Sequence, residues 1–313
     1  MRVLVTGAHG FVGRWLTREL TDHGHDVVEA PPSAELDITD RDAVQRLVRG
    51  AAPDAIAHLA AVSFAGDARR DVERALRVNV GGTAAVLEAI RGLSKRPVLL
   101  VTGSSEVYGA PRPDDLPLRE NAPLRATAPY GLSKLAQEGV AVELATAFEI
   151  PLVVARAFNH IGPGQRPEFV VPALAGRIAD AVAGRADAIP IGNADVRRDF
   201  LDVRDVVRAY RLLLESAERR PDPGPPVVVN VASGVSVSIR WIAETMKRYA
   251  ECTADLEVQP GLVRPDDPPD IVGGCDLLTE MTGWRPVGAL DATLEEILAE
   301  AMARGDRGRG ASA

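Results

Sequence analysis

The chain has 313 residues, of which 46% are hydrophobic and 26% are charged, and its formal net charge at pH 7 is −8. This length suffices for one large α/β domain or for two lobes that share a core, and the composition excludes a collagen-like, low-complexity or wholly disordered chain. The negative charge disfavours sequence-independent binding to nucleic acid or to an anionic membrane, so we expect neither as a partner.

Signals for export, membrane insertion and metal binding do not stand out in the sequence. No uninterrupted apolar run approaches the roughly 20 residues that a membrane-spanning helix needs. The segment Met1–Gly7 reaches a glycine too early for a signal peptide, so we expect a cytoplasmic protein. The two cysteines, Cys252 and Cys275, lack the spacing of metal ligands, so we expect neither a disulfide framework nor a metal site.

The first two-thirds of the chain alternates short β-branched runs with helical patterns, which is typical of βαβ units around a parallel sheet. The expected strands are 3–6, 26–29, 55–58, 98–102 and 152–155, and the expected helices are 11–23, 41–48, 71–90 and 130–148. In helix 71–90, five residues fall near helical spacing and are expected to bury one face, namely Val72, Ala75, Leu76, Val80 and Thr83.

The pattern becomes less regular from about Asn159. We therefore expect residues 1–160 to form the first lobe and residues 161–303 to lie mainly in a smaller second lobe. Residues 198–235 are expected to return in part to the first sheet. The Gly- and Arg-rich residues 304–313 are expected to form a disordered tail.

A glycine-rich loop, Gly7-Ala8-His9-Gly10-Phe11-Val12-Gly13, follows the first strand and opens the first helix. The first glycine permits a tight turn, the second lets a pyrophosphate approach the backbone, and the third lets the helix pack on the strand. Glycines also serve plain turns, but the strand–turn–helix context favours dinucleotide binding. The predicted cofactor contacts in this loop are Gly7, His9, Gly10, Phe11, Val12 and Gly13.

The choice between NAD and NADP stays open. An acid at the end of the second strand holds a ribose 2′-hydroxyl, whereas an arginine accepts a 2′-phosphate. The sequence has Glu29 there and no basic residue. Glu29 either binds the ribose, which favours NAD, or is a solvated strand end. Asp37 and Ile38 either border the adenine, or Asp37 caps the turn before the second helix.

Tyr130 and Lys134 lie four residues apart on a predicted helix and therefore on one face. A tyrosine has a pKa of about 10, which is too high for efficient proton exchange near neutrality. A nearby ammonium and an oxidised nicotinamide favour the phenolate, so we expect Lys134 to lower the pKa of Tyr130. The alternative interpretation is an exposed pair on the protein surface.

A polar turn, Gly103–Gly109, ends the fourth strand, where the ligand crevice of an open α/β sheet lies. The hydroxyl of Ser104 can hydrogen-bond the substrate oxygen that Tyr130 protonates. Glu106 is either a base for a carbon-bound proton or a hydrogen-bonding residue of the turn.

Taken together, these residues resemble the extended short-chain dehydrogenase/reductase family, whose members modify nucleotide sugars. The resemblance runs from Val3 to about Pro286, and its further blocks are His58–Ala61, Asn79–Val80 with Gly82–Thr83, Arg156–Gln165, Arg197–Asp205 and Thr282–Pro286. It implies an α/β fold with a Rossmann-type, doubly wound parallel sheet and a smaller C-terminal substrate-binding lobe.

The resemblance also implies roles for single residues. Ser104, Tyr130 and Lys134 would form a catalytic triad. Leu59, Ala60 and Ala61 would border the cofactor. The implied substrate contacts are Ser63 and Ser105, then Asn159, Arg198 and Arg264 at the nucleotide diphosphate, and Asp267 at the nucleotide ribose. Phe64 is a departure, because reductases of this family tend to have a small polar residue near the sugar.

The implied activity is NAD- or NADP-dependent reduction of the C4 keto group of a nucleotide-linked 4-keto-6-deoxyhexose. The closest resemblance implies a GDP-linked substrate, with GDP-4-dehydro-6-deoxy-D-mannose converted to GDP-D-rhamnose. The alternatives are a 4,6-dehydratase or 4-epimerase with recycled cofactor, and a non-catalytic nucleotide-binding regulatory protein. Family members commonly form homodimers through the helix before the fourth strand and the helix that bears Tyr130 and Lys134, so we expect a homodimer.

Overall fold

Six parallel strands form the central sheet, in the order β2-β1-β3-β4-β5-β9. The computed structural model describes residues 1–219 and 224–310, and no side chains of 305–310. The strand bounds are Arg2–Thr6 for β1, Asp26–Glu29 for β2, Ala55–His58 for β3, Val98–Thr102 for β4, Leu152–Ala157 for β5 and Val227–Val231 for β9. The five strands expected from the sequence coincide with β1 to β5 to within two residues.

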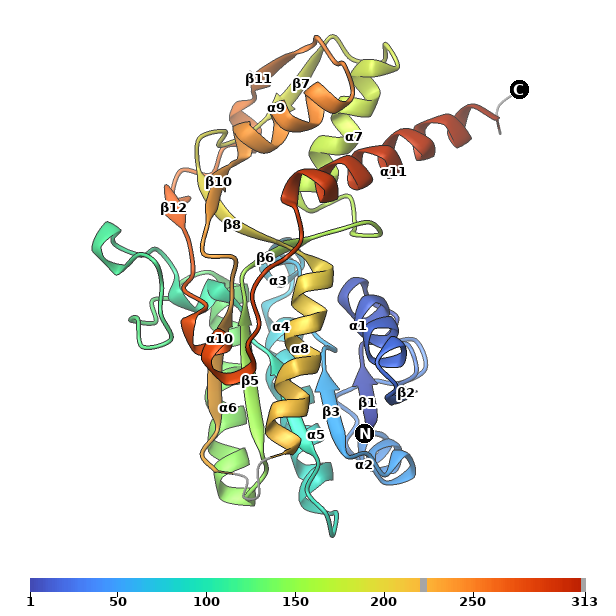
Figure 1. Ribbon diagram of the computed structural model, residues 1–313, viewed down its shortest axis with the longest axis vertical. Coiled ribbons are helices and arrows are strands. Elements are labelled where there is room, and N and C mark those ends of the chain that lie inside the picture. Colours follow the sequence, from blue (N-terminus) through green and yellow to red (C-terminus); the bar gives the residue numbers. More distant parts are fainter. Residues whose placement is uncertain (220–223, 311–313) are drawn as a thin grey trace.

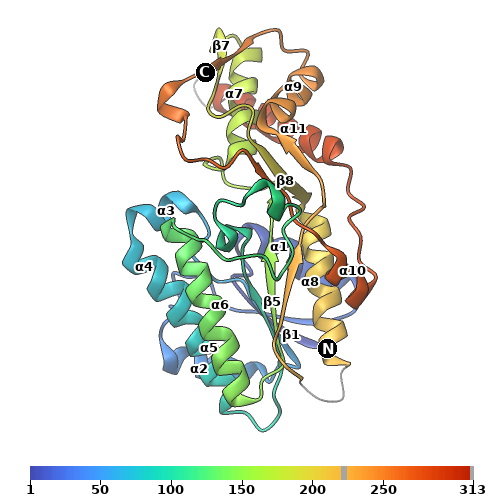
Figure 2. The same cartoon turned by 90° about the vertical axis from the view of Figure 1, so that its left-hand side faces the viewer.

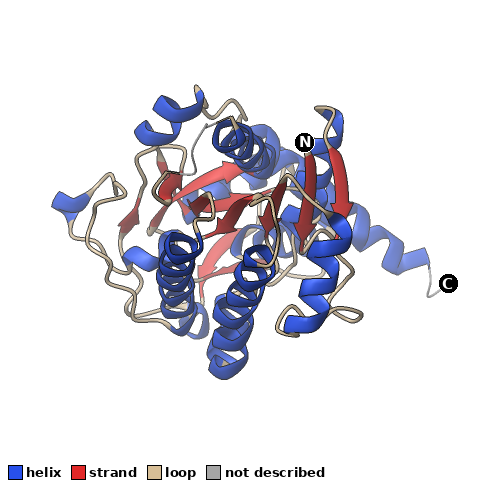
Figure 3. Cartoon of the chain, turned by 90° about the horizontal axis from the view of Figure 1, so that it is seen from below, coloured by secondary structure: helices blue, strands red, loops and turns tan. Residues whose placement is uncertain are grey.

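Helices cover both faces of this sheet, as the view from below shows (Figure 3). One face carries α1 (Phe11–Asp22), α8 (Val203–Glu218) and α10 (Asp276–Thr282). The other carries α2 (Arg41–Ala51), α5 (Gly82–Arg91) and α6 (Pro129–Phe148). Because both faces are covered, β3 and β5 are buried along their whole length. The predicted doubly wound α/β fold is confirmed.

The helix expected at 71–90 is divided by one π-helical turn. Two short helices, α3 (Ala65–Arg70) and α4 (Val72–Leu76), precede the π turn η1 (Arg77–Gly81), and α5 follows it. The extra residue in this turn changes the direction of the side chains that follow it. Ala75 and Thr83 are buried, while Val72 and Leu76, which precede the π turn, are exposed. The expectation of a single buried face over 71–90 is therefore wrong for Val72 and Leu76.

The smaller lobe lies above the carboxyl ends of the central strands in Figure 1. Its strands are β6 (Asn159–Ile161), β7 (Ala188–Ile191), β8 (Arg197–Asp202), β10 (Ser236–Ser238), β11 (Asp255–Val258) and β12 (Asp270–Ile271). β8 pairs with β6, β10 and β12, and β7 pairs with β11. The helices α7 (Val170–Val182), α9 (Ile239–Tyr249) and α11 (Leu290–Gly310) enclose a separate apolar core there.

The chain passes between the lobes several times. After β8 it returns through α8 and β9, and β9 pairs with β5. It returns again at α10, which packs on the main core although it falls inside the range 161–303 expected for the smaller lobe. Trp284, just after α10, is fully buried in the main core and donates its indole N–H to the Asp205 carbonyl at 3.0 Å.

The C-terminal segment differs from the expected disordered tail. α11 continues to Gly310, so residues 304–310 are helical, and 311–313 lie outside the described residues. The Ala-, Leu- and Glu-rich stretch from Leu290 provides a long helix, and extending a formed helix costs much less free energy than nucleating one. Within residues 1–219 and 224–310, no helix combines the length and apolar character of a membrane span.

Candidate active site

The glycine-rich loop leaves the carboxyl end of β1 and leads directly into α1. Gly7 has φ of +72°, a conformation that side chains disfavour. A Cβ on Gly13 would lie 2.1 Å from the Gly7 carbonyl oxygen, so α1 approaches the loop more closely than any other residue type permits. Gly10 is the N-cap of α1 and supplies no side-chain cap. The first N–H groups of this helix thus suit a pyrophosphate, and the loop fits a dinucleotide.

The segment after β3 lies against the glycine-rich loop. A Cβ on Gly7 would come within 2.8 Å of the Ala60 backbone nitrogen. Leu59, Ala60 and Ala61 are partly exposed there, and β3 lies beside β1 where the strand order reverses. The structure therefore brings this predicted segment to the crevice where doubly wound folds bind ligands.

The remaining predicted cofactor residues have different surroundings. His9 is exposed, Val12 packs against the main core, and Phe11 stacks on His160 with a ring-centroid distance of 6.3 Å. Asp37 accepts hydrogen bonds from the Thr39 backbone and hydroxyl at 2.9 and 2.8 Å, so its carboxylate stabilises the turn before α2.

Both acidic and basic side chains lie at the end of β2 and in the segment that follows it. Glu29 is exposed, and its carboxylate lies 3.8 Å from Nδ1 of His9. A guanidinium, that of Arg77, lies 3.7 Å from the Asp37 carboxylate. The Glu29 carboxylate therefore stands at the strand end where a ribose hydroxyl would be held, with an imidazole beside it.

Tyr130 stands at the N-terminal end of α6, close to Ser104 at the end of β4. Burial raises the pKa of Tyr130 to about 12, and the hydrogen bond from the Ser104 hydroxyl opposes this rise without cancelling it. We expected Lys134 to lower the pKa of Tyr130, but in the structure this pKa is raised. The phenol is therefore protonated near neutral pH in this state of the protein.

Lys134, one turn further along α6, is 2% exposed. Burial lowers its pKa to about 7. Its ammonium donates to the Thr102 carbonyl at 2.8 Å and to the Gln137 side-chain oxygen at 2.9 Å. Lys134 is thus held by two protein acceptors one turn away from Tyr130.

Glu106 connects the catalytic end of the sheet with the smaller lobe. It lies in the 3-10 turn η2 (Ser105–Tyr108), whose N-cap is Ser104. Loss of hydration raises the pKa of Glu106, while the nearby cations Arg198 and Arg264 oppose the rise and Asp267 adds to it. Three predicted substrate residues therefore act electrostatically on a predicted catalytic residue.

The predicted substrate residues of the smaller lobe lie on β6, on β8 and in the loop before β12. Arg198 forms an ion pair with Asp267 and donates to the Pro268 carbonyl at 2.8 Å. Asn159 donates to the Asp199 carbonyl at 3.2 Å. The Arg264 side chain is exposed and has no ion-pair or hydrogen-bond partner among the described residues.

The segment that contains Ser63 faces an aromatic cluster from the smaller lobe. Ser63 is exposed, and Ser105, at the start of η2, is partly exposed. Next to Ser63, the ring of Phe64 meets that of Phe169 edge to face at 5.1 Å, and the Arg166 guanidinium lies 5.5 Å from the Phe64 ring centroid. The bulky Phe64 thus contacts the other lobe.

Sequence reasoning named Asn79 and Thr83 in the blocks of the family resemblance but assigned no site role to the buried polar residues near Tyr130 and Lys134. Asn79, in the π turn, accepts a hydrogen bond from the Val62 backbone at 2.8 Å and donates to the Ser133 hydroxyl at 2.9 Å. Gln137 hydrogen-bonds Lys134 directly. The polar residues Asn79 and Thr83 inside an apolar helix were the available signal, but only the fold brings them to α6.

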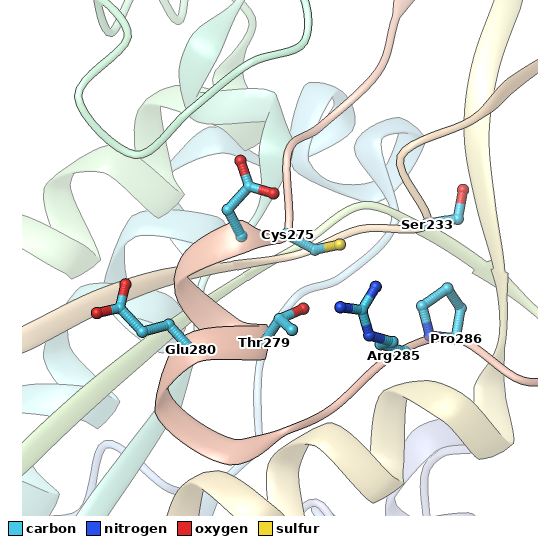
Figure 4. Close-up of a pocket in the computed structure, with 7 residues that line it drawn as sticks. Ser233, Cys275, Thr279, Glu280, Arg285 and Pro286 are labelled. Atoms are coloured by element: carbon cyan, nitrogen blue, oxygen red, sulfur yellow. The ribbon is translucent and has the colours of Figure 1, made fainter.

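A separate cavity of about 500 Å³ lies between α10 and the loop that follows β9 (Figure 4). Its lining residues are Ser233, Cys275, Asp276, Thr279, Glu280, Arg285 and Pro286. None of the predicted site residues lines it. Among the described residues, no group of three or more His, Cys, Asp or Glu is arranged to hold a metal ion.

A dinucleotide loop at the point where the strand order reverses, with Ser104, Tyr130 and Lys134 at the same end of the sheet, defines a nicotinamide-dependent enzyme. Residues 3–232 match the NAD dependent epimerase/dehydratase family. The chain belongs to this family, and it is an NAD(P)-dependent oxidoreductase of the extended short-chain dehydrogenase/reductase type.

The relatives include several nucleotide-sugar enzymes. The chain is 33% identical to GDP-6-deoxy-D-mannose reductase from Pseudomonas aeruginosa, over 96% of both chains. It is 30% identical to UDP-glucose 4-epimerase from Streptomyces lividans, over 91% of both. The solved structure of RMD from Pseudomonas aeruginosa complexed with NADPH matches with a TM-score of 0.87 and 32% identity, and covers 97% of this chain and 100% of that chain.

Proposed function

We propose that the protein reduces the C4 keto group of a nucleotide-linked 4-keto-6-deoxyhexose, with GDP-4-dehydro-6-deoxy-D-mannose as substrate and GDP-D-rhamnose as product. The observation that carries the proposal is the position of Ser104, Tyr130 and Lys134 beside the glycine-rich loop, in a chain 33% identical to a GDP-6-deoxy-D-mannose reductase. The nicotinamide, when bound, supplies the hydride.

The roles of the side chains follow from their positions. Tyr130 donates its phenolic proton to the substrate oxygen at C4 as that oxygen gains negative charge. Ser104 hydrogen-bonds the same oxygen and orients it. In its ammonium form Lys134 has three N–H donors and uses two on protein acceptors, so one is left for the cofactor ribose.

The protonated state of Tyr130 matches what the proposed reduction needs. A reductase needs a phenol that gives up a proton, whereas an epimerase or dehydratase starts by removing a proton from the C4 hydroxyl. The pKa of about 12 keeps the phenol in the donor form at neutral pH.

The smaller lobe is proposed to bind the nucleotide diphosphate. The free guanidinium of Arg264 suits a phosphate oxygen, because a guanidinium matches phosphate geometry. Arg198 is already paired with Asp267, so substrate binding would redistribute that pair, with Arg198 and Asn159 at the phosphates and Asp267 at the nucleotide ribose. Ser63 and Ser105 would contact the sugar.

One observation favours a second candidate, a 4,6-dehydratase. The pKa of Glu106 is raised, and the residue lies two positions after Ser104, as a base for the C5 proton would require. A dehydratase consumes no reductant overall, whereas a reductase consumes one reduced nicotinamide per product.

A spectrophotometric assay tests the proposal. Purified protein is mixed with GDP-4-dehydro-6-deoxy-D-mannose and either NADPH or NADH, and the reduced-nicotinamide absorbance is followed. Stoichiometric loss of absorbance supports the reductase, and comparison of the two coenzymes decides the role of Glu29. No loss, together with turnover of an intact nucleotide sugar without added reductant, would support the dehydratase or the epimerase instead.

Replacement of Tyr130 provides the mutational test. Tyr130→Phe removes the proton donor and should lower kcat by about 10²- to 10⁴-fold, while the dissociation constant of the coenzyme changes little. Steady-state kinetics and coenzyme fluorescence measure the two quantities. Wild-type rates in this variant would refute the role of Tyr130 as the acid.

The proposed assembly is a homodimer formed through α4, α5 and α6, and the proposed location is the cytoplasm. α4 and α6 lie side by side on one flank of the molecule (Figure 2). They carry three exposed apolar side chains, Val72, Leu76 and Leu132. The two free cysteines, Cys252 and Cys275, suit a reducing compartment.

A further inference from the structure

A continuous chain of hydrogen bonds runs from Lys134 through the interior to the end of β1. Gln137 donates its amide N–H to the Thr83 hydroxyl at 2.8 Å, and Thr83 contacts Nε2 of His58 at 3.1 Å. Nδ1 of His58 contacts the Thr6 hydroxyl at 2.8 Å. All five side chains are at most 2% exposed. Water therefore does not compete for these groups, and each must be satisfied inside the protein.

With Lys134 in its ammonium form, the donors and acceptors in the first half of this chain have only one consistent arrangement. Lys134 donates to the Gln137 side-chain oxygen, and in its ammonium form it has no lone pair, so the group of Gln137 that faces it is the carbonyl. The Gln137 NH₂ consequently faces Thr83. The Thr83 hydroxyl donates to the Asn79 carbonyl at 2.7 Å, so it accepts from Gln137.

The second half follows from the first. Because the Thr83 hydrogen is used on Asn79, His58 must donate to Thr83 from Nε2. Burial lowers the pKa of His58 to about 3, so the imidazole is neutral and its Nδ1 accepts from the Thr6 hydroxyl. Thr6 in turn accepts from the Ala60 backbone N–H at 3.3 Å. The chain thus joins Lys134 to the backbone beside the glycine-rich loop.

We propose that Gln137 is a positioning residue, which holds the Lys134 ammonium in place by means of the fixed chain through Thr83 and His58. The inference rests on the proposed function, in which Lys134 holds the cofactor ribose. An acceptor at Gln137 fixes one N–H of Lys134, the Thr102 carbonyl fixes the second, and the third is directed to the site.

The ionisable groups around Lys134 are few. His58 approaches it from β3 and is neutral. Tyr130 precedes it by one turn on α6, with Glu106 of η2 acting on Tyr130. Glu138, one turn later, is engaged by Arg156 of β5 with an Nε–Oε2 distance of 2.9 Å. The helix α5 presents the uncharged Thr83. A charge placed at residue 137 would therefore dominate the environment of Lys134.

Two substitutions of similar size make opposite predictions. Gln137→Met removes the acceptor, so the Lys134 ammonium loses a partner and deprotonates at lower pH. Gln137→Glu places a carboxylate at the same distance, and an opposite charge this close shifts a pKa by about 1 to 3 units. The basic limb of the pH profile of kcat should move to lower pH in Gln137→Met and to higher pH in Gln137→Glu.

The experiment also measures a property of the cofactor-free protein. The pH at which stability to urea begins to rise reports the ionisation of Lys134 in the folded state, and it should move in the same direction as the kinetic limb. Glu143→Gln, on the exposed side of α6, is the matched control and should change neither curve. Thr83→Ser keeps the hydroxyl and should resemble wild type, whereas Thr83→Val breaks the chain and should resemble Gln137→Met.

Each outcome is decisive. Opposite shifts in the two Gln137 variants support the positioning role. If Gln137→Met does not fold, Gln137→Glu and Thr83→Val decide by the same curves, and unchanged curves in these variants would overturn the inference. Failure of wild-type protein to oxidise a reduced nicotinamide with any nucleotide sugar would instead contradict the proposed function, and the urea curves would still test Gln137.

Discussion

Burial has opposite effects on the two ionisable groups of α6. It raises the pKa of the Tyr130 phenol and lowers that of the Lys134 ammonium, since a low dielectric disfavours whichever form is charged. Both groups therefore tend towards their neutral forms. A neutral phenol is the form that donates a proton, as the proposed reduction requires.

The buried ammonium of Lys134 should reduce the stability of the fold. Its pKa of about 7 lies below the ordinary lysine value of 10.5. Between these two values the unfolded chain binds a proton that the folded chain does not, so the free energy of unfolding should rise as pH increases from about 7 to about 10. Each unit of pKa corresponds to about 1.4 kcal/mol.

Lys134→Met should therefore be more stable than wild type near pH 7 and should lack the rise at higher pH, while its activity is lost. Urea unfolding at several pH values measures this. Lys247→Met, on α9 in the smaller lobe, serves as the control and should keep the wild-type slope. A Lys134→Met protein that unfolds more easily than wild type at pH 7 would contradict the assignment of a buried, destabilising charge.

At the scale of elements, the close approach of α1 to the glycine-rich loop depends on Gly13. A Cβ there would lie 2.1 Å from one backbone oxygen and 2.6 Å from another, so the helix must move away. Since the N–H groups of α1 are the proposed phosphate ligands, this movement would affect binding as well as folding.

Gly13→Ala should destabilise the protein by about 1 to 3 kcal/mol and weaken coenzyme binding by more than tenfold. Thermal unfolding and a fluorescence titration with NADPH and NADH measure the two effects. Gly139→Ala is a matched control, because a Cβ on this α6 glycine meets nothing within 4 Å. It should stabilise the protein by about 0.5 to 1 kcal/mol. Wild-type coenzyme affinity in Gly13→Ala would exclude the proposed phosphate site.

The π turn between α4 and α5 shows an element whose details the sequence pattern did not predict. Helical spacing placed Val72 and Leu76 on a buried face, and they are exposed. The turn instead points Asn79 inward, where it holds the Val62 backbone and the Ser133 hydroxyl. An inserted residue changes the side-chain direction without changing the composition, so periodicity alone does not detect it.

At the scale of the whole molecule, the exposed apolar residues of α4 and α6 favour association of two copies. Val72, Leu76 and Leu132 are each more than 40% exposed. Leu76→Glu combined with Leu132→Glu should convert the proposed dimer to a monomer, because paired carboxylates would have to be buried in the contact. Sedimentation equilibrium of both proteins measures this. A monomeric wild-type protein would contradict the proposal.

The two lobes meet at the proposed substrate-binding site. Glu106 from the main lobe is influenced by Arg198, Arg264 and Asp267 from the smaller one, and Phe64 meets Phe169 across the same boundary. Because the chain crosses between the lobes through α8, β9 and α10, neither lobe corresponds to one continuous segment. The site is therefore a property of the folded molecule and not of either half.

The sequence by itself determined those features of the protein that depend only on residues close together in the chain. The five strands β1 to β5 follow from short apolar runs, and the turn at Gly7 and the packing at Gly13 follow from the absence of a side chain. The spacing of Tyr130 and Lys134 places them on one face of any helix. These features depend on neighbouring residues, so they can be predicted from the sequence without the fold.

The tertiary structure alone decided what surrounds these residues. Gln137 meets Thr83, and Thr83 meets His58, only because α6, α5 and β3 pack together, and the same packing removes the water that would otherwise set the pKa values of Lys134 and Tyr130 near their ordinary values. Desolvation and long-range hydrogen bonding depend on residues distant in the sequence, and no local pattern encodes them.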